Sequence, residues 1–131
     1  MKNDFSILLV EDDEDDQMLF MEAVNELDTG INCKCTSTAE GGLRVLRSSI
    51  GEKPDYIFLD LNLPMMNGLE FLEEVKASKE LKSIPVIIFS TSTRESDREK
   101  AKQLGAVNFI SKPHNYNELK NKLHDALNLI N

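Results

Sequence analysis

The segment YIFLDLNLP at residues 56–64 indicates the fold of this chain more strongly than any other stretch. Its first four residues lack the alternation of apolar and polar residues that a half-exposed strand shows. A short, mostly apolar run of this kind is typical of a parallel strand that is covered on both faces. Asp60 comes directly after the run, and Pro64 ends the segment. We therefore expect a buried parallel strand with a carboxylate at its carboxyl end.

Two other runs repeat this pattern, ILLV at residues 7–10 and VIIF at residues 86–89. Residues 31–37 alternate more and are more polar, which suits a strand at the edge of a sheet. Residues 107–110 form a fifth run with β-branched residues. The sequence therefore predicts strands at 5–10, 31–37, 56–59, 86–89 and 107–110.

After each strand, apolar residues recur at the three- and four-residue spacing of amphipathic helices. The stripes run through Phe20, Ala23, Val24 and Leu27; Ala39, Leu43, Leu46 and Ile50; Leu69, Leu72 and Val75; Ala101 and Leu104; and Leu119, Leu123, Ala126 and Ile130. Gly51 and Gly105 end the second and fourth helices. The fourth helix, about 95–104, has only two apolar anchors, so it suits a mobile element. The fifth spans about 116–130.

Strands and helices alternate strictly, and this order is typical of a doubly wound α/β fold. We expect one domain over residues 1–131, a (βα)5 three-layer sandwich around a parallel five-stranded sheet with right-handed crossovers. A common strand order of such flavodoxin-like sheets is 2-1-3-4-5. In that order the strand before Asp60 is central, and ligands bind at the carboxyl ends of the strands.

The chain has 131 residues, 40% of them apolar, with 15 Lys and Arg against 23 Asp and Glu. Its net charge of -8 repels nucleic-acid phosphates, which disfavours direct binding to DNA or RNA. The first residues do not form a signal peptide, and no apolar run approaches the length that spans a membrane. We therefore expect a soluble, cytoplasmic protein that acts without nucleic acid or membrane.

The chain has two cysteines, Cys33 and Cys35. They stand one residue apart on the predicted edge strand, where they cannot close an unstrained disulfide with each other. No histidine or further cysteine lies near them in the sequence to suggest a zinc site. We expect both to be small, reduced residues that pack against the core.

Polar residues with complementary chemistry follow four of the predicted strands. Glu11 and Asp12 come after the first strand, Asp60 after the third, Ser90 after the fourth and Lys112 after the fifth. Three carboxylates close together repel one another, and a hard divalent cation such as Mg²⁺ relieves the repulsion. A cation, a lysine and a hydroxyl around one aspartate suit phosphoryl transfer. The pattern predicts that Asp60 is a nucleophile that forms an acyl phosphate.

Each of these features also has an ordinary explanation. An acidic run such as Glu11 to Asp16 is what the N-terminus of a helix favours through its dipole. Asp60 could be a turn residue, Lys112 a solvated lysine and Ser90 a loop cap. What favours a site is that all of these residues fall at the same end of different strands.

Together the motifs resemble the receiver domains of two-component response regulators, over essentially the whole chain. The motifs are LLVED at residues 8–12, DLNLP at residues 60–64 with Asn67-Gly68, PVIIFS at residues 85–90, and Lys112-Pro113. Each is common as a fragment, and the full set in this order is specific. The resemblance implies a response regulator of a phosphorelay, which takes a phosphoryl group from a histidine kinase onto Asp60.

The resemblance also implies a metal site for Mg²⁺ or Mn²⁺. Its ligands would be the carboxylates of Glu11, Asp12 and Asp60 and the main-chain carbonyl of Asn62. Asp60 would thus be a metal ligand as well as the phosphoacceptor. The protein would not be an enzyme in the ordinary sense, although it would catalyse its own phosphotransfer and a slow dephosphorylation.

Further residues would respond to the phosphoryl group. Lys112 would contact the phosphoryl oxygens and precede Pro113 through a cis peptide bond. Ser90 would be the switch hydroxyl and Phe109 the switch aromatic residue. Phe109 lacks the hydroxyl of the tyrosine often found there, so coupling to Ser90 would depend on the position of the ring. His114 replaces the phenylalanine that often follows, and an incidental surface histidine is the simplest explanation.

A narrower resemblance is to the stand-alone regulators that partner bacterial phytochrome kinases. It depends on the long segment 47–54 and on the sequence of residues 60–92, and it implies a bacterial phytochrome as the sensor histidine kinase.

Phosphorylation adds about two negative charges and would alter the face of the fourth helix, fifth strand and fifth helix. We expect no output domain, so output would pass through a downstream protein, a homodimer or onward phosphotransfer, and the sequence leaves these three open.

Three other protein classes share parts of the pattern. A haloacid-dehalogenase-type phosphatase needs a second acid two residues after its nucleophile, where this chain has Asn62. A flavodoxin-like cofactor carrier binds phosphate after the first strand, where this chain has a repelling acidic run. A pseudo-receiver, which binds partners but never takes phosphate, is the serious alternative. A module of that kind has no physical need to keep the repelling carboxylates together.

Overall fold

The computed structural model describes residues 5–27, 30–48, 52–91 and 94–130. Along the chain its elements are β1 (Phe5–Val10), α1 (Glu14–Leu27), β2 (Ile31–Thr36), α2 (Ala39–Ser48), β3 (Tyr56–Leu59), α3 (Gly68–Ala77), β4 (Val86–Ser90), α4 (Glu95–Gln103), β5 (Asn108–Ser111) and α5 (Tyr116–Ile130). The strands form one parallel, 5-stranded sheet in the order β2-β1-β3-β4-β5. The predicted fold class and strand order are confirmed.

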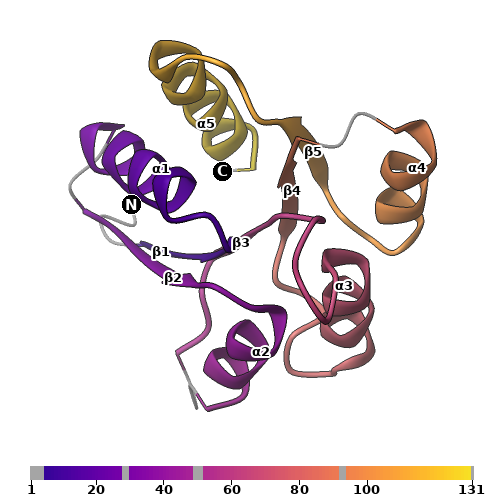
Figure 1. Cartoon of the computed structure of the whole chain (residues 1–131). Helices are drawn as coiled ribbons and strands as arrows, with labels where there is room; N and C mark the ends of the chain where they lie inside the picture. Colours follow the sequence, from indigo (N-terminus) through magenta and orange to yellow (C-terminus); the bar gives the residue numbers. More distant parts are fainter. Residues whose placement is uncertain (1–4, 28–29, 49–51, 92–93, 131) are drawn as a thin grey trace.

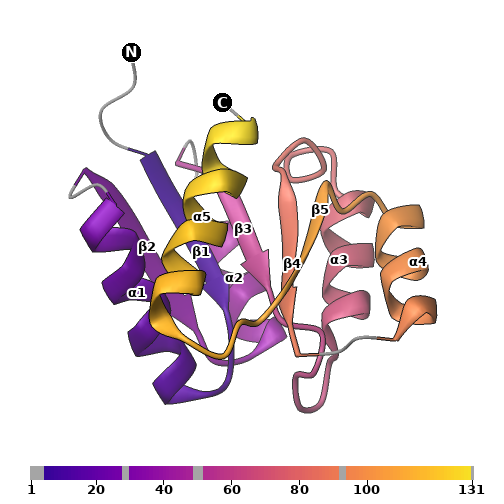
Figure 2. The ribbon, with the colours of Figure 1, turned by 90° about the horizontal axis from the view of Figure 1, so that it is seen from above.

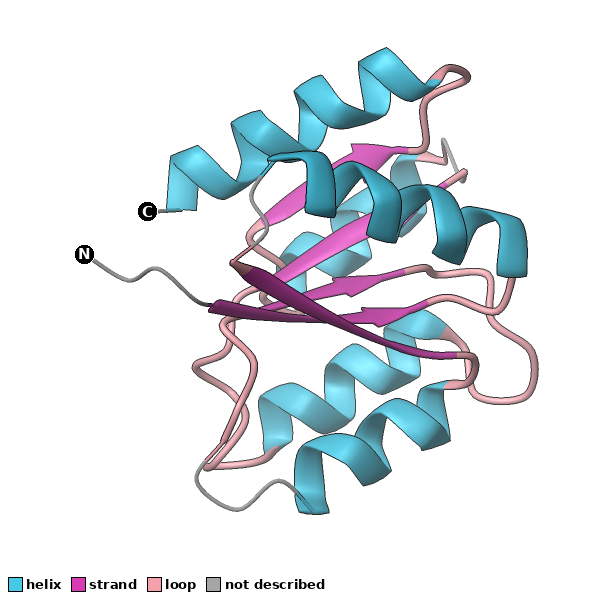
Figure 3. Ribbon diagram, turned by 90° about the vertical axis from the view of Figure 1, so that its left-hand side faces the viewer, coloured by secondary structure: helices cyan, strands magenta, loops and turns pink. Residues whose placement is uncertain are grey.

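Helices cover both faces of the sheet, and the strands run in the same direction between them (Figure 3). α1 and α5 lie on one face, and α2, α3 and α4 lie on the other (Figure 1). Alternate residues of a central strand point into the two layers: Leu8 and Val10 pack on the α2–α3 side, and Ile7 and Leu9 on the α1–α5 side. Burial on both faces explains why the central strands read as nearly unbroken apolar runs.

Aromatic contacts fix α1 against the sheet. The ring of Phe20 is fully buried and meets the rings of Phe58 and Phe89 edge-on, with centroid distances of 5.0 and 5.5 Å. This is a favoured arrangement for aromatic pairs. Because the acidic first turn of α1 lies on the same rigid helix, this packing also sets its position at the rim of the sheet.

α4 lies at the outer end of its layer, beyond α3 (Figure 2). Of its two predicted anchors, Ala101 is buried, whereas Leu104 is half-buried and follows the end of the helix. Gly105 follows the end of the helix with a positive φ of 103°. The Gly105 N–H donates to the Lys102 carbonyl and the Ala106 N–H donates to the Ala101 carbonyl, both at 3.0 Å. Within the described part of the chain, no helix is long and apolar enough to cross a membrane.

Several boundaries differ from the prediction by one residue. β2 ends at Thr36, β4 continues through Ser90, β5 spans Asn108–Ser111 and α4 ends at Gln103. Ser90 pairs with Ser111, because main-chain pairing continues at the rim whether or not the side chains are polar. The predicted end of the second helix at Ile50 and Gly51, and the side chain of Ile130, lie outside the described residues.

Candidate functional site

The carboxyl ends of β1 and β3 lie side by side in the middle of the sheet. The main-chain N–H of Asp60 donates to the carbonyl of Val10 at 3.1 Å, so parallel pairing continues one residue beyond these strands. The N–H of Glu11 donates to the carbonyl of Thr36 at 3.0 Å, which holds the start of the acidic run against β2. These bonds bring Glu11 and Asp60 to the same edge of the sheet, next to each other.

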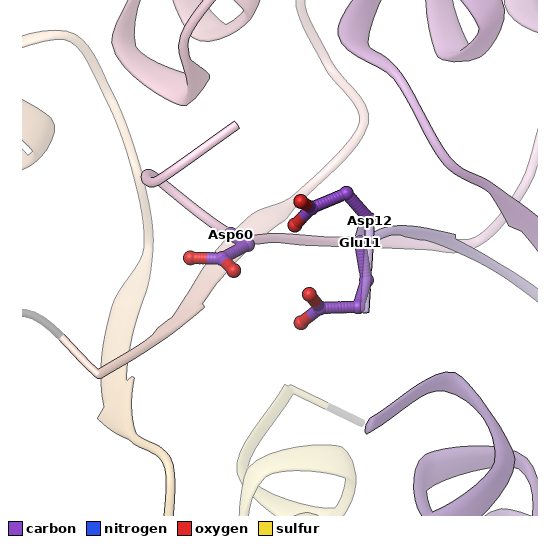
Figure 4. A group of neighbouring side chains, drawn as sticks. All are labelled: Glu11, Asp12 and Asp60. Atoms are coloured by element: carbon purple, nitrogen blue, oxygen red, sulfur yellow. The ribbon is translucent and has the colours of Figure 1, made fainter. Parts of the chain in front are cut away.

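The three predicted carboxylate ligands come together at this edge. The carboxylates of Glu11 and Asp12 point toward Asp60 (Figure 4), and one oxygen of each residue lies within 4.8 Å of the others. Glu11 and Asp60 are buried, whereas Asp12 is exposed and leaves the group open to solvent. Clustered oxygen donors with an open side suit a hard divalent cation such as Mg²⁺ or Mn²⁺.

Lys112 supplies positive charge to the same group. Its Nζ lies 2.5 Å from Glu11 Oε1, 3.0 Å from Asp60 Oδ2 and 2.9 Å from Asp16 Oδ2. The Lys112 side chain is only 10% exposed, so these ion pairs are poorly screened by water. One ammonium group therefore joins the ends of β1, β3 and β5 and the first turn of α1.

Burial and charge act against each other in this group. Burial raises the pKa of Glu11 to about 7 and outweighs the hydrogen bonds from Lys112 and from the Asp13 N–H. Burial also acts to lower the pKa of Lys112, but the hydrogen bonds to Glu11 and Asp16 and the charge of Asp60 reverse this, so the pKa lies above its usual value. Lys112 is thus the stable cation of the site, and added positive charge would favour ionised Glu11.

Asp60 is held by donors on both carboxylate oxygens. The hydroxyl of Ser90, at the end of β4, donates to Oδ1 at 2.9 Å, and the main-chain N–H of Asn62 donates to Oδ1 at 3.1 Å. Lys112 donates to Oδ2 at 3.0 Å. Ser90 has no exposed surface. The structure thus brings the predicted hydroxyl and lysine to the predicted nucleophile.

The family model of the response regulator receiver domain matches residues 7–124. The chain belongs to this family. The matched span contains every residue of the site described above, and it identifies the chain as a receiver domain of two-component signalling. Membership decides against the phosphatase and cofactor-carrier alternatives, whereas a pseudo-receiver would be a variant within the family.

This receiver is similar to several known proteins. A curated relative, the probable methanogenesis regulatory protein FilR2 of Methanothrix harundinacea, is 32% identical over 124 residues, which is 92% of this chain and 80% of FilR2. Among solved structures, the phosphorylated cyanobacterial phytochrome response regulator RcpA is 31% identical, with a TM-score of 0.87 over 94% of this chain and 91% of RcpA. The Mn²⁺-bound response regulator Rcp1 is 29% identical, with a TM-score of 0.83 over 92% and 90% of the two chains.

Phe109 of this receiver is half-buried on β5 and lies under a side chain from α4. The guanidinium carbon of Arg98 is 4.7 Å from the centroid of the Phe109 ring. A cation over an aromatic face is a weakly attractive contact. Arg98 therefore links the thinly anchored α4 to the predicted switch residue. No pattern in the sequence predicts this contact, because it depends on how α4 is rotated about its axis.

The loop between Asp60 and α3 is held tightly in this receiver. The N–H of Gly68 donates to the Leu61 carbonyl at 3.1 Å. Asn67 and Glu70 form a capping box at the start of α3, each side chain accepting the other residue's N–H at 3.0 Å. A Cβ atom on Gly68 would stand 2.4 Å from the Asp60 carbonyl oxygen. The Asn67-Gly68 motif therefore supports the main chain that carries the nucleophile.

The predicted cis peptide bond between Lys112 and Pro113 is not found, since none of the described peptide bonds is cis. The trans form is ordinarily favoured before proline by about 0.5–1 kcal/mol, and with it Lys112 already reaches Asp60.

Asp16 is a site residue that the prediction did not single out. The acidic run was visible in the sequence, but the helical position that turns Asp16 toward Lys112 was not. His114 is exposed, as expected of an incidental residue.

Proposed function

We propose that Asp60 accepts a phosphoryl group and that this modification is the signal the protein transmits. The observation that carries the proposal is the environment of Asp60: a buried hydroxyl on Oδ1, an ammonium group on Oδ2 and two further carboxylates beside it. The clustered carboxylates repel one another. A receiver that never took phosphate would gain nothing from this arrangement, so the proposal favours an active receiver over a pseudo-receiver.

The chemistry would be a nucleophilic displacement at phosphorus. A carboxylate oxygen of Asp60 attacks the phosphorus of a phosphohistidine, the P–N bond breaks, and the leaving imidazole takes a proton from solvent. Lys112 and Ser90, which now hold Asp60, would turn to the phosphoryl oxygens. The Lys112 ammonium group would offset the negative charge of these oxygens, and the Ser90 hydroxyl would donate a hydrogen bond to one of them. The acyl phosphate then stores the signal.

Glu11, Asp12 and Asp60 would hold Mg²⁺ or Mn²⁺ together with the main-chain carbonyl of Asn62. The clustered oxygens within 4.8 Å fit such a cation. When bound, the ion supplies positive charge at the transferring phosphoryl oxygens. Asn62 offers no carboxylate for activating water, which supports slow dephosphorylation and a role as a signalling protein without a turnover activity of its own.

The phosphodonor would be a sensor histidine kinase, as in other two-component systems. RcpA, the cyanobacterial phytochrome response regulator, matches this chain over nearly its full length. That similarity supports a bacterial phytochrome as the kinase, and a cytoplasmic location for the pair is part of the proposal. The net charge of -8 supports action through a downstream protein or a homodimer, without direct binding to nucleic acid.

Mixing the protein with Mg²⁺ and acetyl phosphate tests the phosphoacceptor. Intact-mass measurement should find an adduct of one phosphoryl group on the wild type and none on Asp60→Asn, because an amide cannot act as the acceptor. Asp125→Asn is the matched control, since Asp125 is 77% exposed and lies outside the site, and it should be labelled like the wild type. An equal adduct on Asp60→Asn, or none on the wild type, would contradict the proposal.

Phe109 and α4 would carry the signal to the surface. After phosphorylation Ser90 would move toward the phosphoryl group, and the Phe109 ring would turn inward and leave Arg98, which now lies over it. The link between α4 and β5 would then loosen, altering the face of α4, β5 and α5. Such a change is a shift between two packings that both exist beforehand.

Amide hydrogen exchange of α4 measures this coupling without a known partner. Acetyl phosphate should change the exchange of residues 95–103 in the wild type and in Phe109→Tyr, which keeps the ring. The change should be lost in Phe109→Ala, although this variant should still form the adduct on Asp60. An unaltered response of α4 in Phe109→Ala would show that the aromatic ring does not carry the signal.

A further inference from the structure

Asp16 holds Lys112 from outside the group of carboxylates that fits a divalent cation. Its Oδ2 atom lies 2.9 Å from Lys112 Nζ. The other two partners of this ammonium group, Glu11 and Asp60, belong to the group that would bind the cation. A cation among those carboxylates would offset their negative charge and repel the ammonium group. Asp16 would then be the only carboxylate partner left to Lys112 among the described residues.

The first turn of α1 and its packing fix the direction in which Asp16 points. The Asp16 N–H donates to Asp13 Oδ1 at 3.0 Å, and the Gln17 N–H donates to the Asp13 carbonyl at 3.0 Å, so Asp13 caps the helix. Phe20 comes four residues after Asp16, on the same face of the helix, and is fully buried against the sheet. The burial of Phe20 therefore turns Asp16 toward the rim, where Lys112 follows β5.

Packing does not lock the Lys112 side chain in place. A cavity of about 80 Å³ lies between α1 and the start of α5, and Lys112, Asp16 and Pro113 are among the residues that line it. A cavity of this size is large enough to admit water, so the flexible lysine stem has room to move. The position of the ammonium group beside Asp60 therefore depends on its charged partners.

We propose that Asp16 is a positioning residue, which keeps the Lys112 ammonium group beside Asp60 while the divalent cation is bound. This role rests on the proposed function, in which Lys112 meets the oxygens of the transferring phosphoryl group. With Asp16 present, Lys112 can release its other two carboxylate partners to the cation and keep one ion pair. Without Asp16, Lys112 would depend on those two carboxylates alone and would compete with the cation for them.

Mg²⁺ titration by isothermal calorimetry measures the first consequence. Asp16→Asn should weaken Mg²⁺ binding by about tenfold, the lower end of the range for residues that support metal ligands. Asp15→Asn is the matched control, because Asp15 lies in the same turn of α1, is exposed and, among the described residues, does not pair with Lys112. It should bind Mg²⁺ as the wild type does. Asp16→Glu retains a carboxylate at this position and should keep most of the affinity.

A double-mutant cycle shows whether Asp16 acts through Lys112. In a Lys112→Met background no ammonium group competes with the cation, so adding Asp16→Asn should not change the Mg²⁺ affinity further. An equal loss in both backgrounds would overturn the role, because the Asp16 charge would then act on the cation directly. The free energy of unfolding of Asp16→Asn should stay near that of the wild type, because the Asp16 side chain is 36% exposed and water screens its ion pair.

The rate of adduct formation with acetyl phosphate at saturating Mg²⁺ measures the second consequence. Asp16→Asn should react about tenfold more slowly than the wild type even when the cation site is full, because the ammonium group is no longer held beside the phosphoryl oxygens. Asp15→Asn should react as the wild type does.

Wild-type values of the Mg²⁺ affinity or of the saturated rate in Asp16→Asn would overturn the role of Asp16 and leave the phosphoacceptor proposal intact. Equal losses in Asp15→Asn would overturn it too, because a general loss of negative charge would then be the cause. A wild type that forms no adduct would instead contradict the phosphoacceptor proposal. The Mg²⁺ cycle needs no phosphorylation, so it would still show whether Asp16 holds Lys112.

Discussion

Lys112→Met should lower the free energy of unfolding by about 3 kcal/mol when no divalent cation is present, which is the scale for removing one partner of a buried ion pair. Lys112 Nζ contacts Glu11 and Asp60, whose side chains are 1% and 6% exposed. Methionine keeps the approximate length of the side chain and removes its charge. The decrease in the free energy of unfolding therefore measures the cost of leaving the carboxylates without a counter-charge. Asp16, which is 36% exposed, should contribute little because water screens it.

Mg²⁺ should then stabilise Lys112→Met more than it stabilises the wild type. In the wild type, the ammonium group already occupies two of the carboxylates that would bind the ion. Without this competing charge, a cation that binds only the folded state should raise the melting temperature further. Thermal unfolding with and without Mg²⁺, read by circular dichroism, measures both effects.

Lys120→Met is the matched control for the lysine prediction. Lys120 pairs with Glu26 at 3.1 Å, but the two side chains are 31% and 45% exposed. Exposed ion pairs contribute about 0–1 kcal/mol, so this variant should stay near wild-type stability and keep the wild-type response to Mg²⁺. Equal losses in the two lysine variants, or no difference in their response to Mg²⁺, would contradict the role given to Lys112.

Gly68→Ala should destabilise the protein by about 2–3 kcal/mol, the upper part of the range for overpacking. The added Cβ would stand 2.4 Å from the Asp60 carbonyl oxygen and 2.7 Å from Leu61 Cα, and both are main-chain atoms that cannot turn aside. Helix propensity alone gives the opposite sign, because alanine is favoured over glycine in a helix by about 1 kcal/mol. The sign of the stability change in this variant therefore shows whether close packing or helix propensity dominates at this position.

The same substitution should slow phosphorylation, because the main chain of Asp60 and Leu61 must move to admit the new atom. Gly41→Ala is the control, since its Cβ would meet only side-chain atoms within 4 Å, with the Thr38 hydroxyl nearest at 3.0 Å, and no main-chain atom opposes a small shift. Denaturant unfolding and the rate of adduct formation with acetyl phosphate measure the two effects. A Gly68→Ala variant as stable and as reactive as the wild type would show that the close approach has no consequence.

Much of the fold and the main site residues could be predicted because they depend on chain order. Runs buried on both faces mark the central strands, and a parallel sheet collects the carboxyl ends of its strands along one edge. Asp60, Ser90 and Lys112 could thus be assigned to one site although 30 and 52 residues separate Asp60 from the other two. The residue-level boundaries were less certain, because main-chain pairing at the rim does not depend on side-chain polarity.

The amino-acid sequence by itself determined the order of the elements and which chemical groups meet at the edge of the sheet. The tertiary structure decided how those groups are arranged: Lys112 joins three carboxylates, Gly68 lies against the main chain of Asp60, and Arg98 covers Phe109. These contacts depend on how each helix is rotated and set against the sheet. That rotation comes from the packing of whole buried faces, and no local spacing of residues encodes it.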